Sequence, residues 1–322
     1  MYKWICLTLL VALAGCGTPS FLVTPVRATQ DLEEIEVQPA GGWGGSGKIV
    51  VIPIDGLLTN AQTGGLLQPT ENPMSLFQQQ LDKIEADDSV KAIVLRVNSP
   101  GGTVTCSDAI YTLLMRYKAK THVPIVASTQ EVCASGAYYI SCAADKIVAQ
   151  PTSVVGSIGV IFETFDASGT MKMIGLKTDP IKSAEHKDIG SPFRPATDDE
   201  RKIMQSIVDE YFARFKSVVK QHRAIKDEDW TMVTDGRVFS GETAKQLGLV
   251  DETGLLEDAI GLAKQLGNAP HAKVVSFRRP YAYAGSIYAS NSIQPPQANV
   301  MMLQLPGERT VLPDGFYYVW QP

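Results

Sequence analysis

The sequence lacks the features that mark several classes of protein. It has no long basic run and a net charge of −5 over 322 residues, which argues against nucleic acid as a partner. Its five cysteines form no Cys-x-x-Cys pair and no Cys/His cluster, so we predict no metal site and no other cofactor. Beyond the N-terminus no segment is long and apolar enough to span a bilayer. What remains is a globular chain of ordinary composition, long enough for one large core or two smaller ones.

The N-terminal residues have the pattern of an export signal. One lysine precedes an apolar stretch that is too short to span a bilayer, and small residues follow it. The end of this stretch, Leu13-Ala-Gly-Cys16, resembles the lipobox of bacterial lipoproteins, in which the cysteine carries lipid and becomes the first residue of the mature chain. Acyl chains on Cys16 would hold the protein at a membrane surface. We therefore expect an exported lipoprotein of the bacterial cell envelope, with an ordinary cleaved signal as the alternative.

The chain divides into four parts by composition. Residues 1–16 are the predicted lipoprotein signal, and residues 17–47, which are polar and end in a glycine-rich run, are typical of a flexible tether. Residues 48–279 carry the patterns of a folded domain. The tail, residues 280–322, has no role that we can assign, although 301–305 and 316–320 could add edge strands.

Three cysteines remain when Cys6 in the signal and the lipid-bearing Cys16 are set aside. Cys106, Cys133 and Cys142 are expected to be small buried thiols. Because the predicted compartment is oxidising, a disulfide between Cys133 and Cys142 stays open as an alternative.

Strand and helix patterns alternate along the folded part. Apolar, largely β-branched runs at 48–54, 91–98, 124–128 and 145–150 predict buried strands, and helical spacing is found at 74–86, 105–117 and 134–144. Further helices are predicted at 198–223, 240–247 and 255–266, with a last clear strand at 273–277. This order implies an α/β core with largely parallel strand pairing and additional C-terminal helices.

Ser135 lies where a predicted strand gives way to a predicted helix. The first N–H groups of a helix have no partner inside it and carry partial positive charge, which suits an oxyanion forming beside a serine oxygen. The alternative is that Ser135 only caps its helix, a position that serine favours. A second feature, Asn98-Ser-Pro-Gly-Gly-Thr103, follows the preceding strand. Taken alone, the glycines favour a tight turn. They also leave backbone N–H groups uncovered, and ligands of open α/β sheets gather at such strand ends, which supports a ligand-binding loop.

A serine nucleophile needs a base, and the sequence offers few. His122, His222 and His271 are most simply solvated surface residues. His186 and Lys187 lie together in a polar loop at 181–192. A lysine can serve as the base if its pKa falls from about 10.4 to about 7. This shift corresponds to roughly 4 kcal/mol of differential solvation, which only a closed site can impose.

Four motifs in order resemble the signal peptide peptidase A family of Ser/Lys peptidases. The resemblance covers about residues 48–267 and is carried by Val97-Asn-Ser-Pro-Gly-Gly102, Cys133-Ala-Ser-Gly-Ala-Tyr-Tyr-Ile-Ser141, Gly156-Ser-Ile-Gly159 and Ser183-Ala-Glu-His-Lys-Asp-Ile-Gly-Ser-Pro192. It implies a ClpP/crotonase-like fold and membrane-associated homo-oligomers that degrade cleaved signal peptides and other peptides.

The resemblance also implies a role for each matching residue. Ser135 takes the place of the nucleophile, Lys187 that of the general base and Gly102 that of an oxyanion amide, and Ser157 matches a serine that orients the lysine. The position of Gly136, at the start of the helix, suits a second oxyanion amide. His186 is a weaker rival as base, and Asp188 is expected to accept hydrogen bonds within its loop.

Two other functions are kept as hypotheses. Glycine oxyanion loops also serve crotonase-type enzymes that act on acyl thioesters, which need a carboxylate base. Only Glu131 and Glu163 are candidates for that base. The third hypothesis is a non-catalytic lipoprotein that binds peptides.

Overall fold

The computed structural model describes residues 31–41, 47–60, 72–279, 287 and 315–320. Predictions for the signal, Cys16 and residues 301–305 lie outside this part of the chain. Among the described helices, none combines the length and the hydropathy that crossing a membrane requires.

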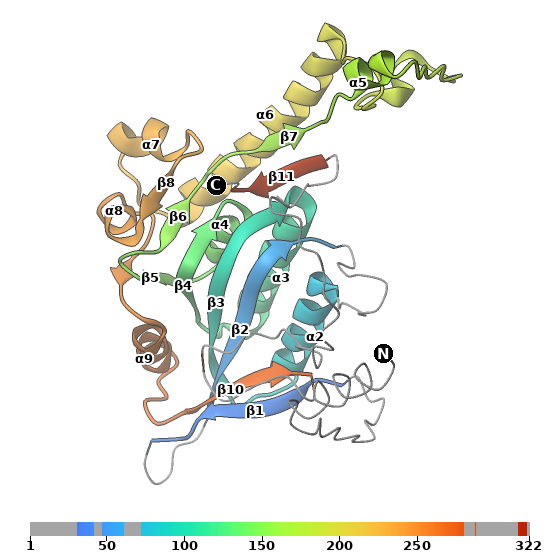
Figure 1. The fold of residues 1–322 in the computed structure, drawn as a ribbon. Coiled ribbons are helices and arrows are strands. Elements are labelled where there is room, and N and C mark those ends of the chain that lie inside the picture. The colour runs from blue at the N-terminus through green and yellow to red at the C-terminus, as the bar shows by residue number, and fades with distance from the viewer. Residues whose placement is uncertain (1–30, 42–46, 61–71, 280–286, 288–314, 321–322) are drawn as a thin grey trace, which may run out of the picture. The chain divides into compact units, whose positions relative to one another are not determined.

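A mostly parallel sheet forms the centre of the fold (Figure 1). Its parallel strands lie side by side in the order β10 (Lys273–Arg278), β2 (Lys48–Leu58), β3 (Val90–Thr103), β4 (Ile125–Ala134), β5 (Lys146–Ala149) and β9 (Glu252–Thr253). An antiparallel strand, β1 (Glu33–Gln38), lies at the edge beside β10. The predicted α/β core with largely parallel pairing is confirmed.

Helices cover both faces of this sheet (Figure 1), which explains why its central strands are apolar without alternation. Successive residues of a strand point to opposite faces, so Val50 and Ile52 pack into one core while Ile49 and Val51 pack into another. The first core is closed by α2 (Pro73–Glu85), α3 (Val104–Thr121), α4 (Gly136–Ser141) and α6 (Asp198–His222), and the second by α9 (Leu256–Leu266).

Between β5 and α6 the chain forms an extension, residues 161–196, that begins with a strand at the margin of the sheet. It contains β7 (Ile161–Glu163), α5 (Ser168–Met173) and a short 3₁₀ helix, η1 (Glu185–Asp188). Figure 1 shows α5 beside the N-terminal end of α6, well away from the central strands. A short strand, β6 (Val154–Gly156), follows β5. After α6 come α7 (Asp227–Val233), β8 (Val238–Ser240) and α8 (Gly241–Gln246).

The structure differs from the sequence-based expectations in two places that concern the strands. The interpretation of Asn98–Thr103 as a tight turn is wrong, because β3 continues through these residues and pairs with β2 as far as Gly102. Within the expected tether, Glu33–Gln38 forms β1, where Glu34 accepts hydrogen bonds from Lys48 (2.6 Å) and Lys273 (2.8 Å).

The C-terminal residues Gly315–Val319 form a strand, β11, that the sequence suggested only as an edge strand. It is antiparallel to residues 101–103 of β3 on one side and to β7 on the other. β11 is therefore enclosed between two strands rather than placed at an edge (Figure 1).

Candidate active site

Ser135 occupies a strained position between β4 and α4. Its backbone has φ 52° and ψ −114°, which is a costly conformation for a residue with a side chain. Its side chain makes no capping hydrogen bond to α4, and its amide instead donates to the carbonyl of Gly156 (2.7 Å). The interpretation of Ser135 as a simple helix cap is therefore wrong. A strained serine at a strand-to-helix turn is the arrangement that presents a nucleophile beside helix N–H groups.

Three glycines bring backbone close to this turn. A methyl group added to Gly101, whose φ is +101°, would come within 2.7 Å of the amide nitrogen of Gly136. One added to Gly102 would lie 1.9 Å from the carbonyl oxygen of Leu58, and one added to Gly136 would lie 2.3 Å from Oγ of Ser107. The two glycine-bearing segments thus meet at the carboxyl ends of β3 and β4, as expected for ligand sites of parallel sheets.

Ser157 lies in the same neighbourhood. β6 pairs with β4 so that Gly156 is opposite Ala134, which places Ser157 next to the Ser135 turn. Ser157 also has a positive φ of 52°, and its amide donates to the carbonyl of Arg237 (2.8 Å). Both serines are buried.

Lys187 is not brought to Ser135 within one chain. It belongs to η1 in the extension, and its side chain is exposed, with no hydrogen bond or ion pair to another described residue. His186, the weaker rival, lies 3.6 Å from Asp199 at the start of α6, and no contact of its side chain with Ser135 is found in the described part of the chain. The structure therefore groups Ser135, Ser157, Gly102 and Gly136 but leaves Lys187 apart from them.

A polar network holds the loop that carries Lys187. Arg194 donates to Asp188 (2.7 Å) and to the buried Glu200 of α6 (2.5 Å), and Lys182 also donates to Asp188 (2.7 Å). Hydrogen bonds from Arg194 lower the pKa of Glu200 to about 2 and hold the pKa of Asp188 well below its usual range. The expectation that Asp188 accepts hydrogen bonds within the loop is confirmed.

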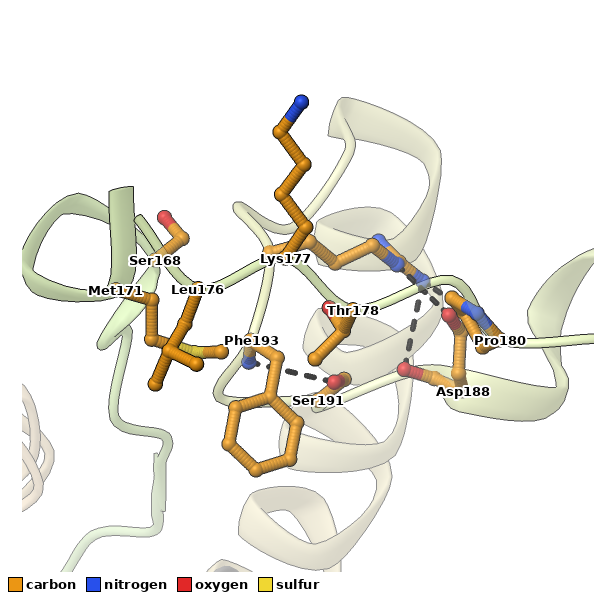
Figure 2. A pocket seen from close by; sticks show the side chains of 10 residues that line it. Ser168, Met171, Leu176, Lys177, Thr178, Pro180, Asp188, Ser191 and Phe193 are labelled. Carbon is orange, nitrogen blue, oxygen red and sulfur yellow. Dashed lines mark hydrogen bonds and ion pairs between the residues drawn. The ribbon is translucent and has the colours of Figure 1, made fainter. Parts of the chain in front are cut away.

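A small cavity of about 260 Å³ opens in the extension beside this network. Figure 2 shows Asp188, Ser191 and Phe193 along its wall, with Met171 and Leu176 opposite. None of the predicted catalytic residues lines it. Within the described part of the chain, no three His, Cys, Asp or Glu side chains gather in a way that could hold a metal ion.

Comparison with known proteins gives a consistent family. The model of peptidase family S49 matches residues 117–269, and that of Clp protease matches residues 58–155. A putative protease of Methanocaldococcus jannaschii is 38% identical over 216 residues, 67% of this chain and 69% of the relative. A putative signal peptide peptidase SppA of Enterococcus faecium is 32% identical, over 76% of this chain and 71% of the relative.

The chain belongs to peptidase family S49. Protease 4 of Haemophilus influenzae, at 33% identity, is matched by 69% of this chain over only 35% of its own length. The predicted membership of the signal peptide peptidase A family and the ClpP-like α/β fold are thus confirmed, and the chain is a peptidase.

The other side chains singled out from the sequence of this S49 peptidase are buried thiols, exposed carboxylates and a half-buried histidine. Cys106, Cys133 and Cys142 are free and buried, and burial raises the pKa of Cys133 and Cys142 to about 12, so these thiols stay protonated. Glu131 and Glu163, the carboxylates that a thioester enzyme would need, are both exposed. The expectation that His222 is solvated is wrong, because it is half-buried and shares a 2.8 Å hydrogen bond with Tyr111.

The sequence suggested one further strand, at 316–320, but assigned it no place at the site. β11 lies directly against the glycines, and the methyl group considered at Gly101 would also come within 2.0 Å of the carbonyl oxygen of Tyr318. The signal that could have indicated this element is the alternation of Phe316, Tyr318 and Trp320.

Proposed function

We propose that this S49 peptidase is a membrane-associated serine endopeptidase that cleaves signal peptides and other extended, apolar peptides. The observation that carries the proposal is the strained, uncapped Ser135 beside the Gly101–Gly102 segment and the first amide of α4. In the mechanism, Oγ of Ser135 attacks the peptide carbonyl and the amides of Gly102 and Gly136 hold the oxyanion.

Lys187 is the general base in this proposal, and it comes from a neighbouring copy of the chain. Its neutral amine accepts the proton of Ser135, passes it to the departing amine, and later activates the water that releases the acyl group. Ser157 orients the amine. Burial between copies would supply the desolvation that a lysine base requires.

Exposed apolar side chains support an assembly of this kind. The extension carries large apolar residues that are at least half exposed: Phe165, Met173, Ile174, Leu176, Ile181 and Phe193. Such a concentration of exposed apolar surface is typical of a protein–protein contact, and it surrounds the loop that holds Lys187. A homo-oligomer would cover it and bring each Lys187 to a partner's serine.

Mixing two inactive variants tests the shared site. Neither Ser135→Ala nor Lys187→Ala is expected to cleave a fluorogenic apolar peptide or to react with a fluorophosphonate at the wild-type rate. Oligomers refolded from equal amounts of both are expected to regain about a quarter of the wild-type activity, because one site in four then combines an intact serine with an intact lysine. If cleavage depends on Ser135 but mixing the two variants restores no activity, Lys187 of a neighbouring copy is not the base.

Membrane attachment through Cys16 is part of the same proposal and needs a separate test. Labelled palmitate is expected to enter the wild-type chain in a bacterial host, and Cys16→Ser is expected to remove both the label and the membrane fraction of the protein. A membrane fraction that survives Cys16→Ser without label would contradict the lipid anchor.

A further inference from the structure

Two fully buried serines flank the glycine segment of β3 and have no part in the mechanism proposed above. The hydroxyls of Ser99 and Ser107 are both hydrogen-bonded to the backbone. A buried hydroxyl that bonds to the backbone restrains the backbone groups that it touches. The two serines are therefore in a position to act on the glycine amides between and beside them.

Ser99 ties the start of the glycine segment to β2. Its hydroxyl donates to the carbonyl of Gly56 (2.6 Å) and accepts from the amide of Gly101 (3.1 Å). The pairing of β2 with β3 is irregular at this point, with a register shift between Asp55 and Leu57 on β2. Ser99 thus holds the two strands together where their regular ladder is interrupted, and it fixes Gly101 in its positive-φ conformation.

Ser107 connects the end of the same segment to α4. It lies near the start of α3, and its hydroxyl donates to the carbonyl of Thr103 (3.0 Å). A methyl group added to Gly136 would come within 2.3 Å of that hydroxyl oxygen and 3.2 Å of Cβ of Ser107. The side chain of Ser107 therefore touches both the residue that follows Gly102 and the first residue of α4.

The two amides of the proposed oxyanion site belong to different elements, because Gly102 lies near the end of β3 and Gly136 begins α4. Two amides stabilise one oxyanion only if both lie within hydrogen-bond distance of it, and small displacements of either lower the rate. Some part of the fold must therefore set their separation.

We propose that Ser107 is a positioning residue that sets the separation of the amides of Gly102 and Gly136. Ser99 is a second positioning residue, which fixes Gly101 and with it the peptide unit that carries the amide of Gly102. The hydrogen of each hydroxyl is already donated to a backbone carbonyl, so both serines act through packing and not as donors to the oxyanion. This inference rests on the function proposed above and deepens it.

The kinetics of Ser107→Ala separate this role from a general structural one. The lost hydroxyl leaves a gap beside Gly136, so kcat for a fluorogenic apolar peptide should fall about tenfold while KM changes by less than about twofold. A peptide aldehyde, which forms a tetrahedral adduct with a serine nucleophile, should bind about tenfold more weakly. The corresponding peptide amide, which forms no adduct, should bind with unchanged affinity. Ser99→Ala should show the same pattern, and wild-type kcat in Ser99→Ala would refute the role of Ser99.

The matched control is Ser141→Ala in α4. Ser141 is as fully buried as Ser107, and its hydroxyl likewise donates to the carbonyl four residues earlier, that of Ala137 (2.9 Å). It approaches Sγ of Cys133 (3.3 Å) rather than the glycines. Ser141→Ala should lower the urea midpoint about as much as Ser107→Ala but should keep the wild-type kcat and affinity for the aldehyde. If both variants lose kcat equally, the rate follows general stability and the inference is wrong.

A pair of substitutions tests the contact between Ser107 and Gly136 directly. Gly136→Ala alone should lower kcat by at least about 10²-fold, because its methyl group meets the hydroxyl of Ser107. Ser107→Gly removes that obstacle, so adding it to Gly136→Ala should raise kcat at least about tenfold, whereas in the wild-type chain it should lower kcat. The recovery should stay incomplete, because the methyl group also lies 3.0 Å from the carbonyl oxygen of Tyr318. A double variant no faster than Gly136→Ala would show that Ser107 does not set the position of this amide.

The wild-type chain separates the failure of this inference from that of the proposed function. If the wild type shows no cleavage that depends on Ser135, the proposed function is wrong and the roles of both positioning serines are wrong with it. If the wild type cleaves through Ser135 and Ser107→Ala cleaves equally fast, the inference about Ser107 alone is refuted.

Discussion

The candidate active site and the extension differ in how firmly the fold of one chain holds them. Around Ser135 the side chains are buried and backbone segments lie close together, so that a methyl group added to Gly102 would lie 1.9 Å from the carbonyl oxygen of Leu58. In the extension, the loop of Lys187 is held by a few polar side chains, and the lysine itself projects into solvent. The comparison teaches that the fold of one chain sets the position of the proposed nucleophile, whereas the position of the proposed base would depend on assembly.

The largest effect is expected from removing the proposed nucleophile. Ser135→Ala should lower kcat for peptide cleavage by about 10³-fold or more, because the attacking atom is lost while the fold is kept. Lys187→Ala should lower it to a similar extent, since nucleophile and base act as a unit. Stopped assays with a fluorogenic peptide measure both. Both variants should unfold at the wild-type urea midpoint. Full activity of Lys187→Ala would show that Lys187 is not the base for Ser135.

The next largest effect concerns the crowded glycines. Gly102→Ala should lower kcat by about 10²- to 10³-fold, comparable to the loss of an oxyanion donor, because the backbone must shift to admit the methyl group. The control is Gly261→Ala in α9, where an added methyl group meets no atom within 4 Å. That change should instead stabilise the fold by about 0.5 to 1 kcal/mol, because alanine loses less entropy than glycine in a helix. Equal activities of the two variants would show that Gly102 has no special position.

The same contrast explains how much the sequence could predict. Apolar strand runs, helical spacing and glycine stops are local signals, and they located the strands β2, β3, β4, β5 and β10, most described helices and the turn of Ser135. The enclosure of β11 could not be predicted, because it depends on pairing with residues 101–103 and 161–163, far away in sequence. The long reach of β3 was missed for the same reason, since glycines usually end a strand and here they are held by strands on both sides.

Local sequence signals also could not predict the separation of Lys187 from Ser135. The motif indicated the lysine but not its distance from the serine. The loop of Lys187 lies between β7 and α6 in the chain, and the directions of these two elements determine its distance from the serine. The helix α7 was missed because its seven residues, Asp227–Val233, are too few to show a clear period.

A smaller effect is expected from the polar network that holds the extension. Arg194→Ala leaves Glu200 and Asp188 without their main donor, so the loop of Lys187 should loosen and kcat should fall by about tenfold. The exposed pair of Arg237 and Asp235 provides the control, because Arg237→Ala removes an ion pair that contributes little. Peptide cleavage and urea unfolding at pH 7 measure both variants.

The pH dependence of this network has a definite sign. The pKa of Glu200 in the folded protein is lowered to about 2, below its ordinary value of 4.5, so the stabilisation is complete above pH 4.5 and is lost as the pH falls towards 2. Between these pH values, the wild-type chain should lose more stability than Arg194→Ala, in which the pKa of Glu200 is no longer lowered by the guanidinium. Urea midpoints at pH 5 and pH 3 test this, and parallel losses in both proteins would contradict it.

The smallest effect separates the stability of the fold from the position of the loop. Thr197 begins α6 with a capping box. The hydroxyl of Thr197 accepts from the amide of Glu200, and the carboxylate of Glu200 accepts from the amide of Thr197. Asn72 caps α2 through its side chain, which accepts from the amides of Met74 and Ser75, and it makes no hydrogen bond to the extension among the described residues. Thr197→Ala and Asn72→Ala should each cost about 1 kcal/mol of stability in urea unfolding.

Only Thr197→Ala should also lower kcat, by a few-fold, since the start of α6 holds the loop through Glu200 and Arg194. If both caps lower kcat equally, the rate follows general stability. If neither does, the loop finds its place from contacts in the assembly and not from its own chain, and the role of assembly in placing the base becomes larger still.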